Sequence, residues 1–204
     1  MHDHAIEVAL SERFGSIALD FVNTVVSTRS GSVDALANGP LVAQWLNRAC
    51  PAAWFDLLPH GPSGQRILHL ESVRLRVTLD TVFEAIAKGH SPDESTIQEL
   101  NRVLAWARRS SRIFVSDASP PALEHVYDPL HPAASLVPIT EEAIRLIGSA
   151  DPARLRRCRA DGCLRWFLDS SKAGRRAWCS MATCGNRAKA ARYRERHEQD
   201  VDGA

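Results

Sequence analysis

The sequence contains few of the features that would assign a protein to a common functional class. No stretch approaches the roughly 18 to 20 consecutive apolar residues that a membrane-spanning helix needs. The N-terminus, MHDHAIEVALSERFGS, has no basic start followed by an apolar block, which argues against a secretory signal. The sequence also lacks a P-loop, a dinucleotide-binding fingerprint, an HExxH motif and a nucleophile elbow. We therefore expect a cytoplasmic protein that is not an enzyme.

The sequence also lacks histidine pairs at metal-ligand spacing, and its cysteines are unevenly placed. The chain has five cysteines and eight histidines among 204 residues. Cys50 stands alone and is expected to be a small buried hydrophobic side chain. The other four cysteines fall within residues 158–184. Because the histidines show no paired spacing typical of a ligand set, the cysteine cluster is the candidate metal site.

Acidic and basic residues are separated along the chain. Residues 1–150 carry 12 Lys and Arg against 17 Asp and Glu, whereas residues 151–204 carry 13 against 7. The net charges are therefore −5 and +6, which add to the +1 of the whole chain. This asymmetry predicts a mildly acidic body, residues 1–150, with a basic module, residues 151–204, attached to it.

Apolar periodicity predicts that the body is mainly helical. SIALDFVNTVV is expected to form one short buried helix over residues 16–26, and the segment 27–40 is expected to be a loop. Ser91, followed by Pro92 and Glu94, is the predicted N-cap of a helix. The remaining predicted elements are helices over 41–49, over 65–88 and from 140 onward, and a hairpin formed by RIFVSD (112–117) and LEHVYDP (123–129).

The four clustered cysteines are spaced as Cys158-x4-Cys163 and Cys179-x4-Cys184, with 15 residues between the pairs. Two close pairs of thiolates at this separation suit tetrahedral zinc, and a reducing cytoplasm disfavours disulfides. Two disulfides, a redox dithiol and an iron–sulfur cluster are the alternatives. Four cysteines leave no open coordination position, so the spacing predicts one structural Zn2+ ion.

The residues around the cysteines predict a knuckle, a hairpin and a helix. LRWFLD (164–169) is expected to be a strand, SSKAG (170–174) a turn and RRAWCS (175–180) a returning strand. MATCGNRAKAARYRERH (181–197) is expected to be a helix whose first turn supplies the last ligand. This order is the layout of a treble-clef zinc finger. The aromatic side chains Trp166, Phe167 and Trp178 are expected to pack over so small a module.

The segments RRCRADGCLRWFLD (156–169) and RRAWCSMATCGNRAKAARYRERH (175–197) resemble the CGNR zinc-finger family of bacterial proteins. The residues that carry the resemblance are the tetrad Cys184-Gly185-Asn186-Arg187, Trp178 before Cys179, Lys189 and Arg196. The four-residue gaps within both cysteine pairs fit this family but differ from the commonest zinc fingers.

The N-terminal part resembles the helical domain of the same family, whose members are described as stress-induced transcription regulators. The matching residues are ALDFVNTV, which includes Asp20, Asn23 and Thr24, and then Leu41, Trp45 and Leu46. The resemblance implies a helical body, a zinc-bound C-terminal module and a role in DNA binding.

The segment after the tetrad is strongly basic. In a helix over 181–197, Lys189, Arg192 and Arg196 share one face, while Arg187 and Arg194 lie on a neighbouring face. Arg175 and Arg176 lie on the predicted hairpin. We predict that these residues contact nucleic acid, since the planar guanidinium fork suits phosphate and guanine. A protein-interaction face and a plain solvated face are the alternatives.

Asp20, Asn23, Thr24 and Arg29 form a polar cluster on an otherwise apolar segment. They are a candidate ligand pocket for a small-molecule effector. They are also a candidate for a buried hydrogen-bond network between packed helices, and without geometry this second interpretation is favoured.

Together, the sequence predicts a mainly α-helical domain with a short β-hairpin, followed by a treble-clef-like zinc finger. The expected function is a DNA-binding transcriptional regulator whose basic helix contacts double-stranded DNA. A protein-interaction adaptor or an RNA binder is the alternative. The helical body could sense an effector or mediate homodimerisation, and two half-sites on one dimer would raise affinity.

Overall fold

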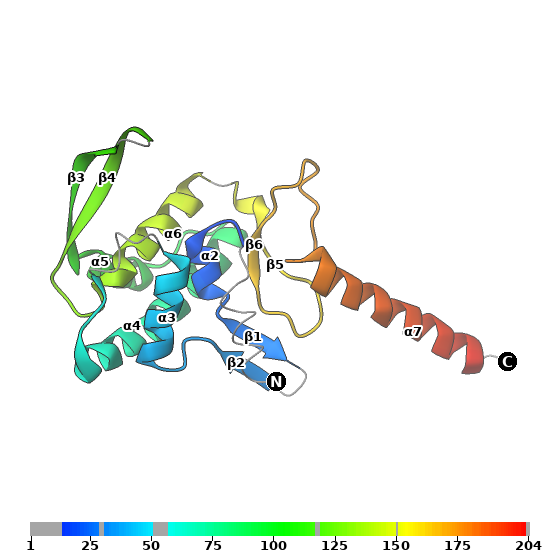
Figure 1. The fold of residues 1–204 in the computed structure, drawn as a ribbon. Helices are drawn as coiled ribbons and strands as arrows, with labels where there is room; N and C mark the ends of the chain where they lie inside the picture. Colours follow the sequence, from blue (N-terminus) through cyan, green and yellow to red (C-terminus); the bar gives the residue numbers. More distant parts are fainter. Residues whose placement is uncertain (1–13, 29–30, 51–56, 117–118, 150, 203–204) are drawn as a thin grey trace.

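The computed structural model describes residues 14–28, 31–50, 57–116, 119–149 and 151–202. The described chain is mainly helical, with three two-stranded antiparallel sheets (Figure 1). Its body contains the helices α2 (Ile17–Val22), α3 (Gly39–Ala49), α4 (Gly61–Ala87), α5 (Glu94–Leu104) and α6 (Val137–Ser149), the last preceded by the short 3-10 helix η2 (Ala134–Leu136). The predicted fold class, mainly α with short hairpins, is therefore confirmed.

Local capping explains where the helices of the body begin. Asn38 accepts a hydrogen bond from Leu41 N at 3.0 Å and starts α3. Asp93 accepts one from Thr96 N at 2.7 Å and starts α5. The predicted cap at Ser91 is wrong, because the carboxylate of Asp93 takes the position from which it can accept that bond.

The long helix α4 lies at the centre of the body and contacts α2, α3, α5 and α6. Its fully buried side chains include Leu68, Leu75, Leu79 and Phe83. Their spacing of seven, four and four residues places them on one helical stripe, as the periodicity of this segment predicts. The helices predicted over 41–49 and 65–88 are confirmed as α3 and α4, and α4 begins earlier, with Pro62 in its first turn.

The predicted helix over residues 16–26 is wrong in its second half. After α2 the chain turns and forms β1 (Val25–Thr28), which pairs with β2 (Gly31–Asp34) in the segment predicted to be a loop. At the end of α2 both the N–H and the hydroxyl of Thr24 donate to Phe21 O, at 3.3 and 2.7 Å, and the Asn23 side chain is bound by the backbone of Trp166. The β-branched residues that follow favour a strand.

The hairpin of β3 (Ala107–Ser116) and β4 (Ser119–Pro129) confirms the prediction and is longer than expected. In Figure 1 it extends from the helices as a narrow arm. Glu141 on α6 holds its base, because it accepts a hydrogen bond from the Tyr127 hydroxyl at 2.6 Å and one from Arg109 at 3.2 Å.

The C-terminal region begins with the 3-10 helix η3 (Pro152–Arg154) and the strands β5 (Leu155–Arg157) and β6 (Trp166–Leu168), which pair with each other. A single π-helical turn, η4 (Met181–Gly185), leads into α7 (Asn186–Asp202). The predicted returning strand over residues 175–180 is wrong: β6 forms its ladder with β5, which precedes the first cysteine of the cluster.

The hydrophobic core continues from the body into the β5–β6 hairpin. Leu155 and Trp166 are buried in the same cluster as the side chains of α2 and α4. Trp166 packs edge-on against Phe83, with 6.0 Å between the ring centroids. The expectation that Trp166 covers the cysteine cluster is therefore wrong, because the ring is buried against the helical body.

Candidate metal centre and basic helix

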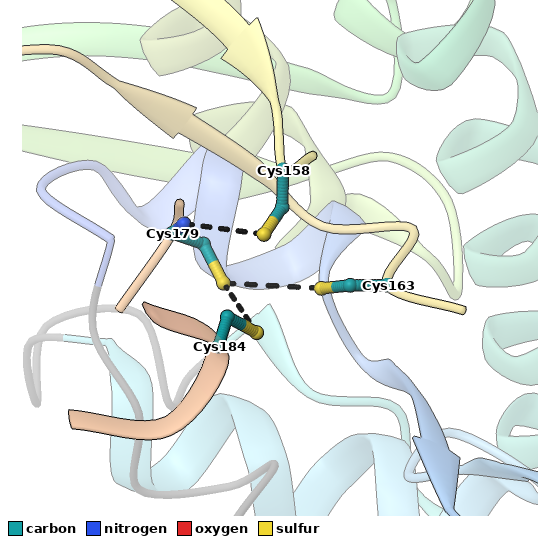
Figure 2. Close-up of side chains that lie close together, drawn as sticks. All are labelled: Cys158, Cys163, Cys179 and Cys184. Atoms are coloured by element: carbon teal, nitrogen blue, oxygen red, sulfur yellow. Dashed lines mark hydrogen bonds between the residues drawn. The ribbon is translucent and has the colours of Figure 1, made fainter. Parts of the chain in front are cut away.

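The four predicted ligands, Cys158, Cys163, Cys179 and Cys184, converge on one point (Figure 2). All four sulfur atoms lie within 4.8 Å of one another. The Cys163–Cys179 and Cys179–Cys184 sulfur pairs are 3.9 and 3.6 Å apart. Sulfur atoms bound tetrahedrally to zinc at 2.3 Å would be about 3.8 Å apart, so the cluster fits one such ion.

Different elements bring the four cysteines together. Cys158 directly follows β5, and Cys163 ends a tight turn in which its N–H donates to Ala160 O at 3.0 Å. Gly162 makes this turn possible because it adopts a φ of +67°, a conformation that favours glycine. Cys184 lies in η4, directly before α7. Cys179 is placed by the loop between β6 and η4.

The electrostatics of the sulfur cluster favour a divalent cation. A hydrogen bond from Cys179 lowers the pKa of Cys163 to about 5. Burial, together with the neighbouring thiolate charge, raises the pKa of Cys184 to about 11. The sulfurs alone would therefore not all ionise near neutral pH, whereas a bound metal ion supplies the positive charge that stabilises four thiolates. The four cysteines hold one structural zinc ion.

Hydrogen bonds from the surrounding chain also reach the sulfurs. Cys179 N donates to Cys158 Sγ at 3.3 Å, and the Arg187 guanidinium donates to Cys184 Sγ at 3.6 Å. Both contacts favour the thiolate form of the acceptor. Arg187, the last residue of the tetrad, therefore has a contact at the metal centre besides its predicted role with nucleic acid.

Asp169, which the sequence analysis did not single out, organises the loop before Cys179. Its buried carboxylate accepts hydrogen bonds from Ser171 N at 3.0 Å, Ser171 Oγ at 2.5 Å and Arg176 N at 2.8 Å. These bonds lower its pKa, the Ser171 hydroxyl most of all. The Asp-Ser-Ser sequence is a recognisable turn signal. It also explains why residues 170–178 form a loop rather than a strand.

The seven basic residues predicted to bind nucleic acid lie in two different surroundings. Arg176 stacks over Phe167 at 4.8 Å and donates to Trp178 O at 2.7 Å and to Cys179 O, so it holds the finger together. The side chain of Arg196 lies outside the described residues. The remaining five are exposed: Arg175 in the loop, and Arg187, Lys189, Arg192 and Arg194 on α7.

Arg157 attaches the finger to the body. It donates two hydrogen bonds to the Asp80 carboxylate on α4, at 2.7 and 2.8 Å, and one to Glu84 at 3.3 Å. Its guanidinium also lies 4.7 Å from the Trp166 ring, whose Nε1 donates to the same Asp80 at 2.7 Å. Finger and body are thus joined by ion pairs as well as by the shared core.

The predicted polar cluster does not converge on a single pocket. Asn23 binds the backbone of Trp166 through both ends of its amide, at 2.7 Å each. Thr24 accepts from Arg76 at 2.9 Å, and Asp20 accepts from Phe14 N at 2.6 Å. Arg29 lies outside the described residues. The described members have the packing contacts that the network interpretation expects, and Asn23 also lines a cavity.

Comparisons with known families agree with this architecture. Residues 15–150 match the family model described as "Putative stress-induced transcription regulator". Residues 154–197 match the model of the CGNR zinc finger. Neither description is that of an enzyme. None of the curated proteins matches the chain. Within the described residues, no helix combines the length and apolar character needed to cross a membrane.

Proposed function

The chain belongs to this family of stress-induced transcription regulators, whose model covers residues 15–150 of its 204 residues, and from that premise we propose that it binds double-stranded DNA through α7. The observation that carries the proposal is the position of the exposed cations. Arg187, Lys189, Arg192 and Arg194 lie on a helix that runs away from the rest of the molecule (Figure 1). A helix of this kind can enter the major groove or follow a phosphate backbone.

The order of charges along α7 supports a bound anion over plain solvation. Anions near the N-terminus of a helix and cations near its C-terminus stabilise the helix dipole. In α7 the order is reversed, with Arg187 and Lys189 in the first turn and Asp200 and Asp202 at the end. This arrangement does not help the isolated helix. The Cys184 thiolate accounts for Arg187, which donates to it, and an external anion such as the DNA backbone is the better explanation for the cations farther along α7.

The zinc centre supports the proposal by fixing the base of α7. The metal ligand Cys184 lies two residues before Asn186, where η4 ends and α7 begins. Asn186 Nδ2 donates to Ala182 O at 3.1 Å and so connects the two helical segments. The finger is in turn joined to α4 through Arg157. A recognition helix held rigidly at one end loses less conformational freedom on binding.

The proposal is tested by fluorescence anisotropy with a pool of genomic duplex fragments across a salt series. The variant Lys189→Ala/Arg192→Ala removes two exposed cations from one face of α7. If both contact phosphates, the slope of log K against log salt should fall in magnitude by about 1.8. The matched control, Arg66→Ala/Arg145→Ala, removes two exposed cations from α4 and α6 and should bind like the wild type.

Circular dichroism and zinc content must match the wild type in both variants. Equal weakening by both variants would indicate non-specific charge attraction and contradict a role for α7. Absence of duplex binding at low salt, with zinc bound, would overturn the proposal and favour the alternatives, an acidic protein partner or RNA.

A further inference from the structure

A cavity of about 250 Å³ lies where the helical body meets the zinc finger. Asn23 lines it from the end of α2, Val77 and Asp80 from α4, and Arg157 and Leu164 from the finger. Pockets for drug-sized ligands usually measure roughly 300 to 1,000 Å³, so this one suits a smaller molecule.

The walls of the cavity are mainly apolar. They include two large hydrophobic side chains that are exposed to solvent. Val77 is 62% exposed and Leu164 is 57% exposed, although both are large hydrophobic residues. They come from different parts of the chain, α4 and the turn after Cys163, yet both line this one cavity, together with Val22 and Val25. An apolar ligand would remove this surface from water.

The charged groups of the cavity are already paired, which disfavours a charged ligand. Arg76 donates to both oxygens of Asp34, and Arg157 donates to both oxygens of Asp80. An anion or a cation would have to compete with one of these ion pairs. A neutral ligand would leave them intact.

The walls retain hydrogen-bonding capacity of both kinds, because Arg76 and Arg157 use three and four of their five N–H donors. Asp80 accepts two bonds at Oδ1, from Arg157 and from Trp166 Nε1, but only one at Oδ2. A carboxylate offers about two acceptor sites per oxygen, so Oδ2 retains one. The Thr81 hydroxyl donates to Val77 O at 3.1 Å and keeps its acceptor lone pairs. One polar group on the ligand, a donor or an acceptor, therefore finds a partner on the walls.

We infer that this cavity binds a small, neutral, mainly apolar molecule with one hydrogen-bonding group, such as a hydroxyl or an N–H, and that its binding affects the zinc finger. The effect on the zinc finger follows from the positions of two lining residues in the sequence. Arg157 immediately precedes the zinc ligand Cys158 in the chain, and Leu164 immediately follows the zinc ligand Cys163. A ligand that contacts both touches the chain next to two of the four metal ligands.

The binding step is tested by NMR on the 15N-labelled, zinc-loaded full-length chain, with indole as the probe. The Trp166 indole N–H and the Asn23 side-chain amide should shift and saturate, with a dissociation constant of about 0.1 to 1 mM for so small a ligand. Val77→Phe fills the mouth of the cavity and should weaken binding at least about tenfold. The control Leu70→Phe changes another exposed side chain of α4 and should bind normally.

Benzoate, an anion of similar size, should bind at least about tenfold more weakly than indole, since it must compete with the paired charges. No saturable shift at Trp166 and Asn23, or equal shifts in the Val77→Phe variant, would overturn the site. Tighter binding of benzoate would overturn the neutral class of ligand.

The regulatory step rests on the proposed DNA binding and is measured separately, as duplex affinity with and without indole. A change in the wild type that is lost in Val77→Phe supports it, whereas an unchanged affinity overturns this step alone. If the duplex does not bind even without indole, the proposed function fails, and the NMR result still decides whether the cavity binds a ligand.

Discussion

At the scale of single residues, three aspartates hold parts of the structure in place, two of them by joining segments that are distant in the chain. Asp34 binds Arg76 and so fixes the β1–β2 hairpin to α4. Asp80 binds Arg157 and Trp166 and so fixes the finger to α4. Asp169 binds the backbone of its own loop. Bonds from charged partners or from several N–H groups are the stronger hydrogen bonds of proteins, so these carboxylates are sensitive points.

We predict that Asp34→Asn destabilises the body in a pH-dependent manner. Burial alone would raise the pKa of Asp34, but hydrogen bonds from Arg76 and Leu36 N lower it below its ordinary value. A lowered pKa gives stability that is complete above the unfolded value, about 3.9, and is lost as the pH falls through the folded value. The difference in unfolding free energy between wild type and variant should therefore be largest near neutral pH and shrink below about pH 4.

Urea unfolding followed by circular dichroism measures this difference. Zinc loss in acid affects wild type and variant alike, so its contribution cancels from the difference in unfolding free energy. Asp128→Asn, at an exposed position on β4, is the control and should show a small difference at every pH. A difference for Asp34→Asn that stays constant across the pH range would contradict the prediction.

At the scale of elements, the finger consists of two parts that are held by different forces. The β5–β6 hairpin is held by the body, because Leu155 and Trp166 are buried in its core. The loop and turn from Asp169 to Gly185 pack instead, through Cys179 and Cys184, into a second, small cluster that also contains Cys158, Ala160 and Phe167. So small a cluster depends on its metal.

We therefore predict that chelation of zinc unfolds the finger only in part. Hydrogen exchange measured by mass spectrometry should show lost protection over residues 177–185, where Cys179 and Cys184 lose their ligand. Residues 155–157 and 166–168 should keep their protection, because the body still covers them. Loss of protection throughout 155–185, or none at all, would contradict this division of the finger.

At the scale of the whole molecule, body and finger form one continuous structure. The Asn23 amide, the Asp80 carboxylate and the packing of Phe83 all meet at Trp166. The direction in which α7 leaves the molecule therefore depends on the body as well as on zinc. A ligand in the cavity proposed above would therefore have a physical route to the basic helix.

We predict that Trp166→Ala lowers the free energy of unfolding of the helical body by about 3 to 5 kcal/mol, the usual cost of removing a fully buried large aromatic side chain. Trp178→Ala removes the same side chain from a half-buried position beside the cysteine cluster. This control should weaken zinc retention and leave body unfolding nearly unchanged. Urea titration followed by far-ultraviolet circular dichroism, with a parallel zinc release assay, distinguishes the two. Equal effects on the body would contradict the shared core.

Several elements could be predicted because their signals are local. The four ligands lie at a spacing typical of zinc, and the structure confirms that they converge. The helices α3 and α4 and the β3–β4 hairpin follow from apolar periodicity and turn residues. The end of α2 at Val22 could not be predicted in this way, because apolar residues continue at helical spacing beyond it and Asn23 is held by a residue 143 positions away.

The amino-acid sequence by itself therefore determined the helical class, the metal ligands and the basic character of the last helix, since each depends on spacing and composition within one segment. Only the tertiary structure decided which arginines remain exposed on α7 and which, like Arg157 and Arg176, are bound within the protein. It also decided that the β5–β6 hairpin of the finger packs into the core of the body. These outcomes depend on partners that are distant in sequence, and such partners leave no pattern in the segment itself.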